Sequence, residues 1–471
     1  MRPDTKRTVE RKIGMSLPIL MVIVYGVATI AISLVYSRKQ QSLETYFVAE
    51  RNLPLGLVAM LLFGELVAGS STVGNAATAF NNGISSVWGS WGVGAGCIIF
   101  VVFVSKTLFS LGAEKGCMSL AEAYAHLFDD RSRMVMMVTT VVVYFIIFST
   151  QAPAAAAILS PLLGIDYSVA VWIFAAVFIG VTIFGGLQGV ANMNILNTFV
   201  MIAGMVIVAV KSISSLGGVS SIQASLPANF FNIGYPNIWT VLAQGLGSAL
   251  GCIVAATVTS ACFSAKSHKV ANRGILLAGI VVIPFALLPS LIGMSARIVA
   301  PDIHSNTALY EMANHLGPIF GGIISIACLA AIMDSSGLLL IVTTTITRDF
   351  YKHLLFPKAT DRQQLVFSKI AAIVVGVTAT WFGMNASSIL GQVLGAFQIR
   401  SIAGIVLLAK IIWPSVSKDA AFYSMFMGGL IAMVWHFAGN PFGTQPLWPG
   451  AAVCLTILIP MTLFGKNKHD K

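Results

Sequence analysis

The sequence predicts an all-α protein that crosses a membrane many times. Of its 471 residues, 57% are hydrophobic and only 10% are charged, whereas water-soluble proteins carry about 25% charged residues. Apolar runs of roughly 20 residues recur from end to end, which is the length that a helix needs to cross about 30 Å of hydrocarbon. A membrane β-barrel would show short segments of alternating polarity instead. The chain therefore needs lipid around it, and its pattern is helical.

Thirteen candidate spans can be marked along the chain. The first, from about Ile13 to Tyr36, follows a basic stretch as a signal peptide would. It is longer than the usual apolar core of about 7 to 15 residues and lacks a small-residue cleavage site, so we expect a retained helix. The expected spans are residues 13–36, 54–80, 87–111, 133–162, 166–185, 193–215, 236–262, 274–297, 317–345, 367–384, 388–411, 420–438 and 448–465.

The basic residues predict the orientation. Lys and Arg in short loops stay in the cytoplasm, and one set of loops carries nearly all of them, while the other set has little besides Arg297. With an odd number of spans, this places the C-terminus in the cytoplasm and the N-terminus outside, in the inner membrane of a bacterium. The N-terminal tail, with Arg2 and Lys6, opposes this assignment locally. The net charge of +11 thus indicates membrane orientation and not binding to nucleic acid.

Small residues interrupt two of the spans. The stretch Gly64–Gly74 in the second span is a poor continuous helix, and Gln244–Gly251 in the seventh span resembles it. The two lie five spans apart. Paired broken helices are typical of inverted-repeat transporters, in which unwound backbone offers carbonyls to cations and helix ends to a substrate. Close helix packing through small residues is the alternative explanation.

Three ionisable residues fall near the middle of their spans: Glu65, Asp334 and Arg400. Charged residues of this kind cost about 2.5 to 3.5 kcal/mol each at mid-membrane, so each should face a partner or a wet cavity. One interpretation is a role in a transport pathway, and the other is a structural ion pair of Arg400 with either acid. The planar fork of Arg400 also suits a carboxylate on a substrate.

Four segments resemble the sodium:solute symporter family, which includes carriers of proline, pantothenate, sialic acid and glucose. The segments are ETYFVAERNL at 44–53, FGGLQGV at 184–190, FSAKSHKVANRG at 263–274 and AAIMDSSGLLLIVTTTITRDFY at 330–351. They occur in the order of the family, and the resemblance covers most of the chain.

The resemblance implies a leucine-transporter-like fold and a function. An N-terminal tail and extra helix (1–53) would precede two inverted five-helix repeats (54–215 and 236–411), and two C-terminal helices with a tail (412–471) would follow. A protein of this kind is a symporter, not an enzyme, and works without a cofactor. It would use sodium to take up a small polar or anionic organic solute, with an organic acid or amino acid favoured, by alternating access. A proton-coupled carrier of the same fold and a sensor that binds a solute without moving it stay open, and so does the oligomeric state.

The resemblance also implies a sodium site between the first and eighth core helices. Carried over residue by residue, its ligands are the carbonyls of Gly64, Val67 and Ala331 and the side chains of Asp334 and Ser335. Oxygen ligands are what a hard cation needs.

Two departures from the family bear on this site. The family usually has two adjacent hydroxyls where this chain has Asp334 and Ser335, and the segment is one residue shorter than usual, so Ser336 is a further candidate ligand. The fifth core helix usually opens with an Asp, and this chain has Asn194 instead. One acid is therefore absent from its usual place and another has appeared at position 334. A buried carboxylate can bind sodium or carry a proton.

The substrate site is expected beside the two breaks. Its candidate residues are Glu65, Ser70, Ser71, Gln151, Gln244 and Arg400. For the two serines and Gln151, helix packing or a hydrogen bond back to the chain is the alternative. The sequence has no HExxH zinc motif and no GxxxxGK[ST] phosphate loop, which disfavours an intramembrane metalloenzyme and a nucleotide hydrolase.

Overall fold

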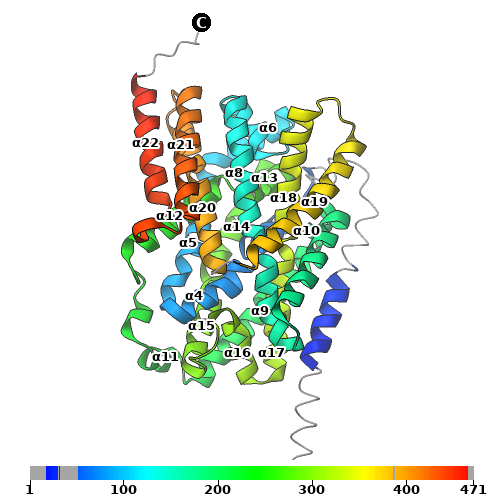
Figure 1. The fold of residues 1–471 in the computed structure, drawn as a ribbon, viewed down its shortest axis with the longest axis vertical. Helices are drawn as coiled ribbons and strands as arrows, with labels where there is room; N and C mark the ends of the chain where they lie inside the picture. The colour runs from blue at the N-terminus through cyan, green and yellow to red at the C-terminus, as the bar shows by residue number, and fades with distance from the viewer. Residues whose placement is uncertain (1–16, 30, 32–50, 386–387, 465–471) are drawn as a thin grey trace, which may run out of the picture.

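The computed structural model describes residues 17–29, 31, 51–385 and 388–464, and the side chains of 184–192 and 336 are not described. In these residues the chain forms a bundle of helices, many of them aligned with the long axis of the molecule (Figure 1). The basic tail, most of the segment 44–53 and the final lysines lie outside the described residues. After the helix Leu17–Thr29 come α3 Leu55–Leu66, η2 Ser70–Gly74, α4 Asn75–Asn82, η3 Gly83–Val87, α5 Trp88–Ile99, η4 Phe100–Val104, α6 Ser105–Lys115, α7 Leu120–Leu127, α8 Asp130–Ser149, α9 Gln151–Leu163, α10 Tyr167–Ser215, α11 Val219–Ser225, η5 Ala228–Phe231, α12 Ile238–Ile253, α13 Ala256–Ser264, α14 His268–Phe285, α15 Leu287–Val299, η6 Ser305–Thr307, α16 Ala308–Leu316, α17 Pro318–Asp334, α18 Ser336–Thr345, η7 Ile346–Leu355, α19 Asp361–Gly383, α20 Ile389–Ile412, α21 Lys418–Phe437, η8 Pro441–Gly443 and α22 Leu447–Phe464.

The expected spans correspond to helices in the described part of the chain. Ten helical stretches there are long and apolar enough to cross a membrane, and three shorter apolar helices accompany them. The second and third expected spans meet at Gly83, which has a φ of 74°. A Cβ at this position would collide with the backbone of Phe230, so only glycine fits this turn.

Helix α10 takes the place of the fifth and sixth expected spans. It is helical from Tyr167 to Ser215, 49 residues, and would measure about 73 Å if straight. Its two ends nevertheless lie at the same end of the molecule. Tyr167 lines a cavity with His304, and Ile213 packs near Ile298, just before the loop that holds His304. The chain therefore reverses within this element, as two successive spans require.

The first predicted break is confirmed. Helix α3 ends at Leu66 and η2 begins at Ser70, and Val67 between them has a non-helical backbone (φ −107°, ψ 27°). All of Val67, Ala68 and Gly69 are buried. Non-helical backbone at this depth is tolerated only inside the protein or beside a cavity.

The second break lies elsewhere than predicted. The stretch 244–251 is helical, and the helix breaks a few residues later, at Val254 and Ala255, between α12 and α13. The glycines of the predicted stretch serve close packing instead: Gly245 abuts Trp88 of α5, and Gly247 abuts Gln398 of α20. The packing explanation was the correct one for this stretch.

Helices α17 and α18 meet at Ser335, which has a turn conformation. Their junction faces α3, and α10 packs against both α3 and α17. The first break therefore lies in the interior of the bundle, surrounded by three elements that come from distant parts of the chain.

Candidate functional site

At the first break, each of two acids packs against a glycine of a neighbouring helix. The carboxylate of Asp334 lies against Gly64, where a Cβ would overlap Oδ2, and the carboxylate of Glu65 lies against Gly337 in the same way. Glu65 is 7% exposed and Asp334 is fully buried. The two carboxylates also interact electrostatically. Two buried acids that interact electrostatically need a cation or protons to offset their charge.

Asp334 is held from its other side by a chain of hydrogen bonds. Asn197 of α10 donates from Nδ2 to Asp334 Oδ1 at 2.7 Å, and Tyr25 donates from Oη to Asn197 Oδ1 at 2.5 Å. All three side chains are buried. Two hydrogen bonds, by way of Asn197, thus connect Tyr25 of the helix Leu17–Thr29 to Asp334 at the first break.

Sequence reasoning missed Tyr25 and Asn197. A signal for Asn197 was present, because an amide in the middle of an apolar span needs a polar partner. Tyr25, near the middle of the first expected span, was a weaker signal, because its ring is apolar and only its hydroxyl needs a partner. Asn194, where the resemblance implies an acid, donates from Nδ2 to the Leu61 carbonyl of α3 at 3.5 Å.

Gln151, a predicted substrate residue, bridges the break and the α17–α18 junction. Its Oε1 accepts from the Gly69 backbone N–H at 3.1 Å and from Ser335 Oγ at 3.0 Å. Its Nε2 donates to the Ile147 carbonyl at 2.8 Å. Gln151 therefore has a structural role in this conformation, and it connects Ser335 to the unwound backbone.

The other predicted residues of the first break lie around it. Ser71 donates from Oγ to the Leu66 carbonyl at 3.2 Å, which is the hydrogen bond back to the chain that was the alternative for it. Val67 and Ser70, which follow α3, and Ala331, on α17, are all buried. The side chain of Ser336 lies outside the described residues.

Gln244 and Arg400 are not part of this cluster. Gln244 is half-buried on α12. In the described part of the chain no ion pair joins Arg400 to Glu65 or Asp334, so the suggested structural ion pair is not the explanation for these charges. Arg400 lies instead beside the second break, where its Nη1 donates to Tyr144 Oη at 3.2 Å.

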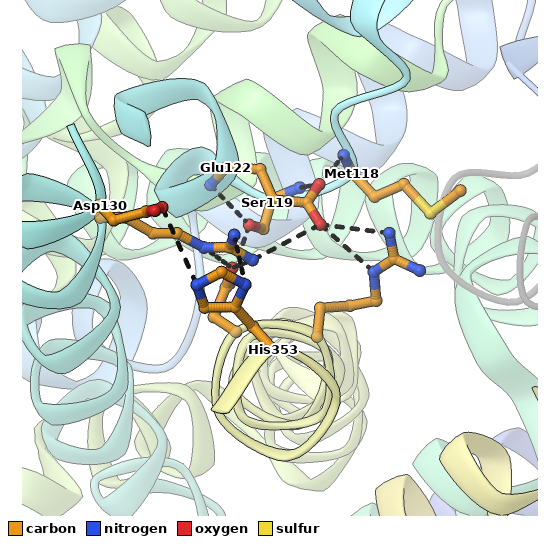
Figure 2. Close-up of polar contacts among 8 residues, drawn as sticks. Met118, Ser119, Glu122, Asp130 and His353 are labelled. Carbon is orange, nitrogen blue, oxygen red and sulfur yellow. Dashed lines mark hydrogen bonds and ion pairs between the residues drawn. The ribbon is translucent and has the colours of Figure 1, made fainter. Parts of the chain in front are cut away.

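A second polar cluster lies at the end of the bundle where α7 meets η7 (Figure 2). Arg133 of α8 donates to the buried Asp349 at 2.7 Å, and Ser119 donates to the other oxygen of Asp349 at 2.9 Å. Arg348 pairs with Glu122 at 3.2 Å. Of these residues, sequence reasoning used only Arg348, as a marker of orientation, and gave Arg133, Glu122 and Asp349 no role. They tie the α7–α8 region to the segment that follows α18.

The fold and the site together define a class of protein. An all-helical membrane bundle with two broken helices and buried polar groups at a break is typical of secondary transporters with inverted repeats. A solved structure of a Na⁺-coupled sialic acid symporter matches 95% of this chain and 97% of its own with a TM-score of 0.82 at 15% identity. A nucleobase-cation-symport-1 family transporter matches 89% of this chain and 94% of its own with a TM-score of 0.61 at 16% identity. The fold is therefore the leucine-transporter-like one, a 5+5 inverted repeat.

The model of the sodium:solute symporter family matches residues 46–428, and the chain belongs to this family. It is similar to the sodium/proline symporter of Escherichia coli K12, with 24% identity over 96% of this chain and 94% of that protein. It is also similar to the osmoregulated proline transporter of Bacillus subtilis 168, with 21% identity over 96% of each chain.

Proposed function

We propose that this protein couples the inward movement of sodium ions to the uptake of a small polar or anionic organic solute. The observation that carries the proposal is the apposition of Asp334 and Gly64 at the first break, deep in the bundle. A carboxylate held against the last turn of α3, next to the unwound residues Val67–Gly69, brings together both kinds of oxygen that a sodium ion needs. Membership of the symporter family supports the same conclusion.

In the proposed cation site, the carbonyls of Gly64, Val67 and Ala331 act together with Asp334 and Ser335. Asn197 orients the carboxylate, and Tyr25 orients Asn197. Sodium would neutralise Asp334 and lower the electrostatic cost of its pairing with Glu65. The chain itself catalyses no reaction on the solute.

Transport would follow alternating access, in which a bundle of helices rocks against a scaffold and releases cation and solute inside. The two inverted repeats would span residues 54–215 and 236–411. Binding of sodium and of solute would each raise the affinity for the other by the same factor. The N-terminus would lie outside and the C-terminus in the cytoplasm of a bacterial inner membrane. This orientation places the basic loops, including the one between α13 and α14, on the cytoplasmic side.

A proton-coupled carrier and a solute sensor are the alternatives. Purified protein in proteoliposomes, with sodium and pH gradients imposed separately, discriminates among the three. L-proline is the first solute to test, because the two relatives are named as proline carriers, followed by other amino acids and short organic acids. We expect accumulation with a sodium gradient alone. Accumulation with a pH gradient alone, or binding without accumulation, would contradict the proposal.

A further inference from the structure

Arg400 is a buried cation that forms no ion pair with an acid of the described residues. It lies on α20 and is 4% exposed. Its Nε has no hydrogen-bond partner. Removing a guanidinium from water without an anion is costly. An anion from outside the chain would remove this cost.

Aromatic rings offset part of the charge. The guanidinium carbon lies 4.5 Å from the ring centre of Phe397 and 5.6 Å from that of Tyr144. Cation–π contacts act on the face of the guanidinium, and its N–H donors point outward in the plane. Those donors are the part of the group that binds a carboxylate with two parallel hydrogen bonds.

The second broken helix meets Arg400 at the same place. A Cβ on Gly251 of α12 would lie 3.2 Å from Arg400 Nε, so the absence of a side chain there lets the guanidinium approach the break. Beyond the break, the Thr257 backbone N–H in the first turn of α13 donates to Tyr144 Oη at 3.0 Å. Tyr144 therefore joins Arg400 to the N-terminal end of a half-helix.

Both neighbours of Tyr144 favour negative charge. The N-terminus of a helix carries a partial positive charge and presents free N–H groups, and α13 has nine residues. Arg400 adds a full positive charge. Tyr144 can supply only one oxygen to the donors of Arg400 and of the first turn of α13. A ligand with two anionic oxygens would accept hydrogen bonds from more of these donors and would also balance the positive charge.

We propose that Arg400 and the first turn of α13 bind the carboxylate of the transported solute. This inference rests on the proposed function and narrows it to solutes with a carboxylate, such as neutral amino acids and short organic acids. The sodium ion and the carboxylate would then occupy different breaks, one in each repeat, and Tyr144 would release its two donors when the solute binds.

The probes for the test are two matched pairs, L-proline with L-prolinamide and L-lactate with L-lactamide. Binding to the purified full-length protein in sodium is measured by thermal stabilisation. We expect the acid of at least one pair to stabilise the protein at a concentration at least about tenfold lower than its amide does, because only the carboxylate can accept two charge-assisted hydrogen bonds from Arg400. Equal responses to acid and amide, or no response to either pair, would overturn the proposal without any variant.

Variants then locate the effect. Arg400→Gln should abolish the preference for the acid, and Arg400→Lys should keep part of it. The matched control is Arg297→Gln, at an end of the bundle beside Phe80. This control should keep the full preference for the acid. Stabilisation by sodium alone should be unchanged in Arg400→Gln, because the cation site lies at the other break. A folded Arg400→Gln that keeps the preference, or one that loses the sodium response as well, overturns the proposal. Failure of sodium-driven uptake in the wild type would instead count against the proposed function, since the acid preference is measured without transport.

Discussion

Gly64 and Asp334 face each other so closely that the glycine has no space for a side chain. The same relation joins Gly337 and Glu65, so the acid at the end of α17 lies over a glycine of α3, and the acid of α3 lies over a glycine of α18. These contacts bring α3 close to the junction of α17 and α18, which is the approach that a shared cation site requires. The proposed function depends on this approach.

Gly64→Ala tests the approach directly. The new methyl group must displace the Asp334 carboxylate, and we expect the sodium concentration for half-maximal uptake to rise at least about tenfold, which corresponds to about 1.4 kcal/mol. The control is Gly56→Ala in the same helix, where an added Cβ meets nothing within 4 Å. Equal sodium dependence of uptake in the two variants would contradict the proposal that sodium binds beside Gly64 and Asp334.

Asp334→Asn removes the charge and keeps the shape. Because a neutral amide is a much weaker ligand for sodium than a carboxylate, we expect the dependence of uptake on sodium to weaken by about a hundredfold or to disappear. Asp302→Asn, at an exposed loop position, is the control. Unchanged coupling in Asp334→Asn would remove this residue from the mechanism.

Tyr25→Phe tests the link from the N-terminal helix. The change removes the donor to Asn197 and leaves a buried amide oxygen without it, at a cost of about 1 to 3 kcal/mol. We expect roughly tenfold weaker sodium binding, measured by sodium-dependent thermal stabilisation. Tyr423→Phe, on the exposed side of α21, should bind sodium normally. Wild-type affinity in Tyr25→Phe would mean that Asn197 orients Asp334 unaided.

Gln151→Leu should mainly affect stability. The leucine leaves the Gly69 N–H and the Ser335 hydroxyl without their acceptor, which costs about 1 to 3 kcal/mol for a buried donor. The melting temperature should fall by several degrees, while Gln223→Leu on the exposed side of α11 leaves it unchanged. A direct role in solute binding would show instead as weaker binding at unchanged stability.

Cys117 can report on the polar cluster at α7. Burial raises the pKa of this thiol to about 11, and the nearby Glu122 adds to the effect, although Arg51 and Arg133 oppose it. The neutral thiol therefore predominates at pH 7 to 8, maleimide labelling should be slow, and its rate should rise as the pH approaches the pKa.

Asp349→Asn weakens the pair with Arg133 and should open this end of the bundle. We expect faster labelling of Cys117, located by mass spectrometry, and an unchanged rate in Asp361→Asn at the exposed start of α19. Equal rates in the two variants would show that the ion pairs do not control access at this end.

Hydropathy predicts most of this fold because lipid imposes it. Length and the scarcity of charge mark membrane spans regardless of what they pack against. The glycines and serines of the stretch 64–74 also predicted the break that the structure has at Val67–Gly69. The second break was misplaced because glycine serves both loops and close packing, and only the neighbours Trp88 and Gln398 decide which. The contact of Tyr25 with Asn197 depends on two helices 172 residues apart meeting, which no local pattern encodes.

The helix Leu17–Thr29 lies ahead of the two proposed repeats, yet its Tyr25 is two hydrogen bonds from the acid at the break. A shortened version that begins at α3 would therefore be expected to change ion affinity even if it inserted and folded. Affinity tags and fluorescent fusions are better attached after α22, at the opposite terminus, where they leave this chain of contacts untouched.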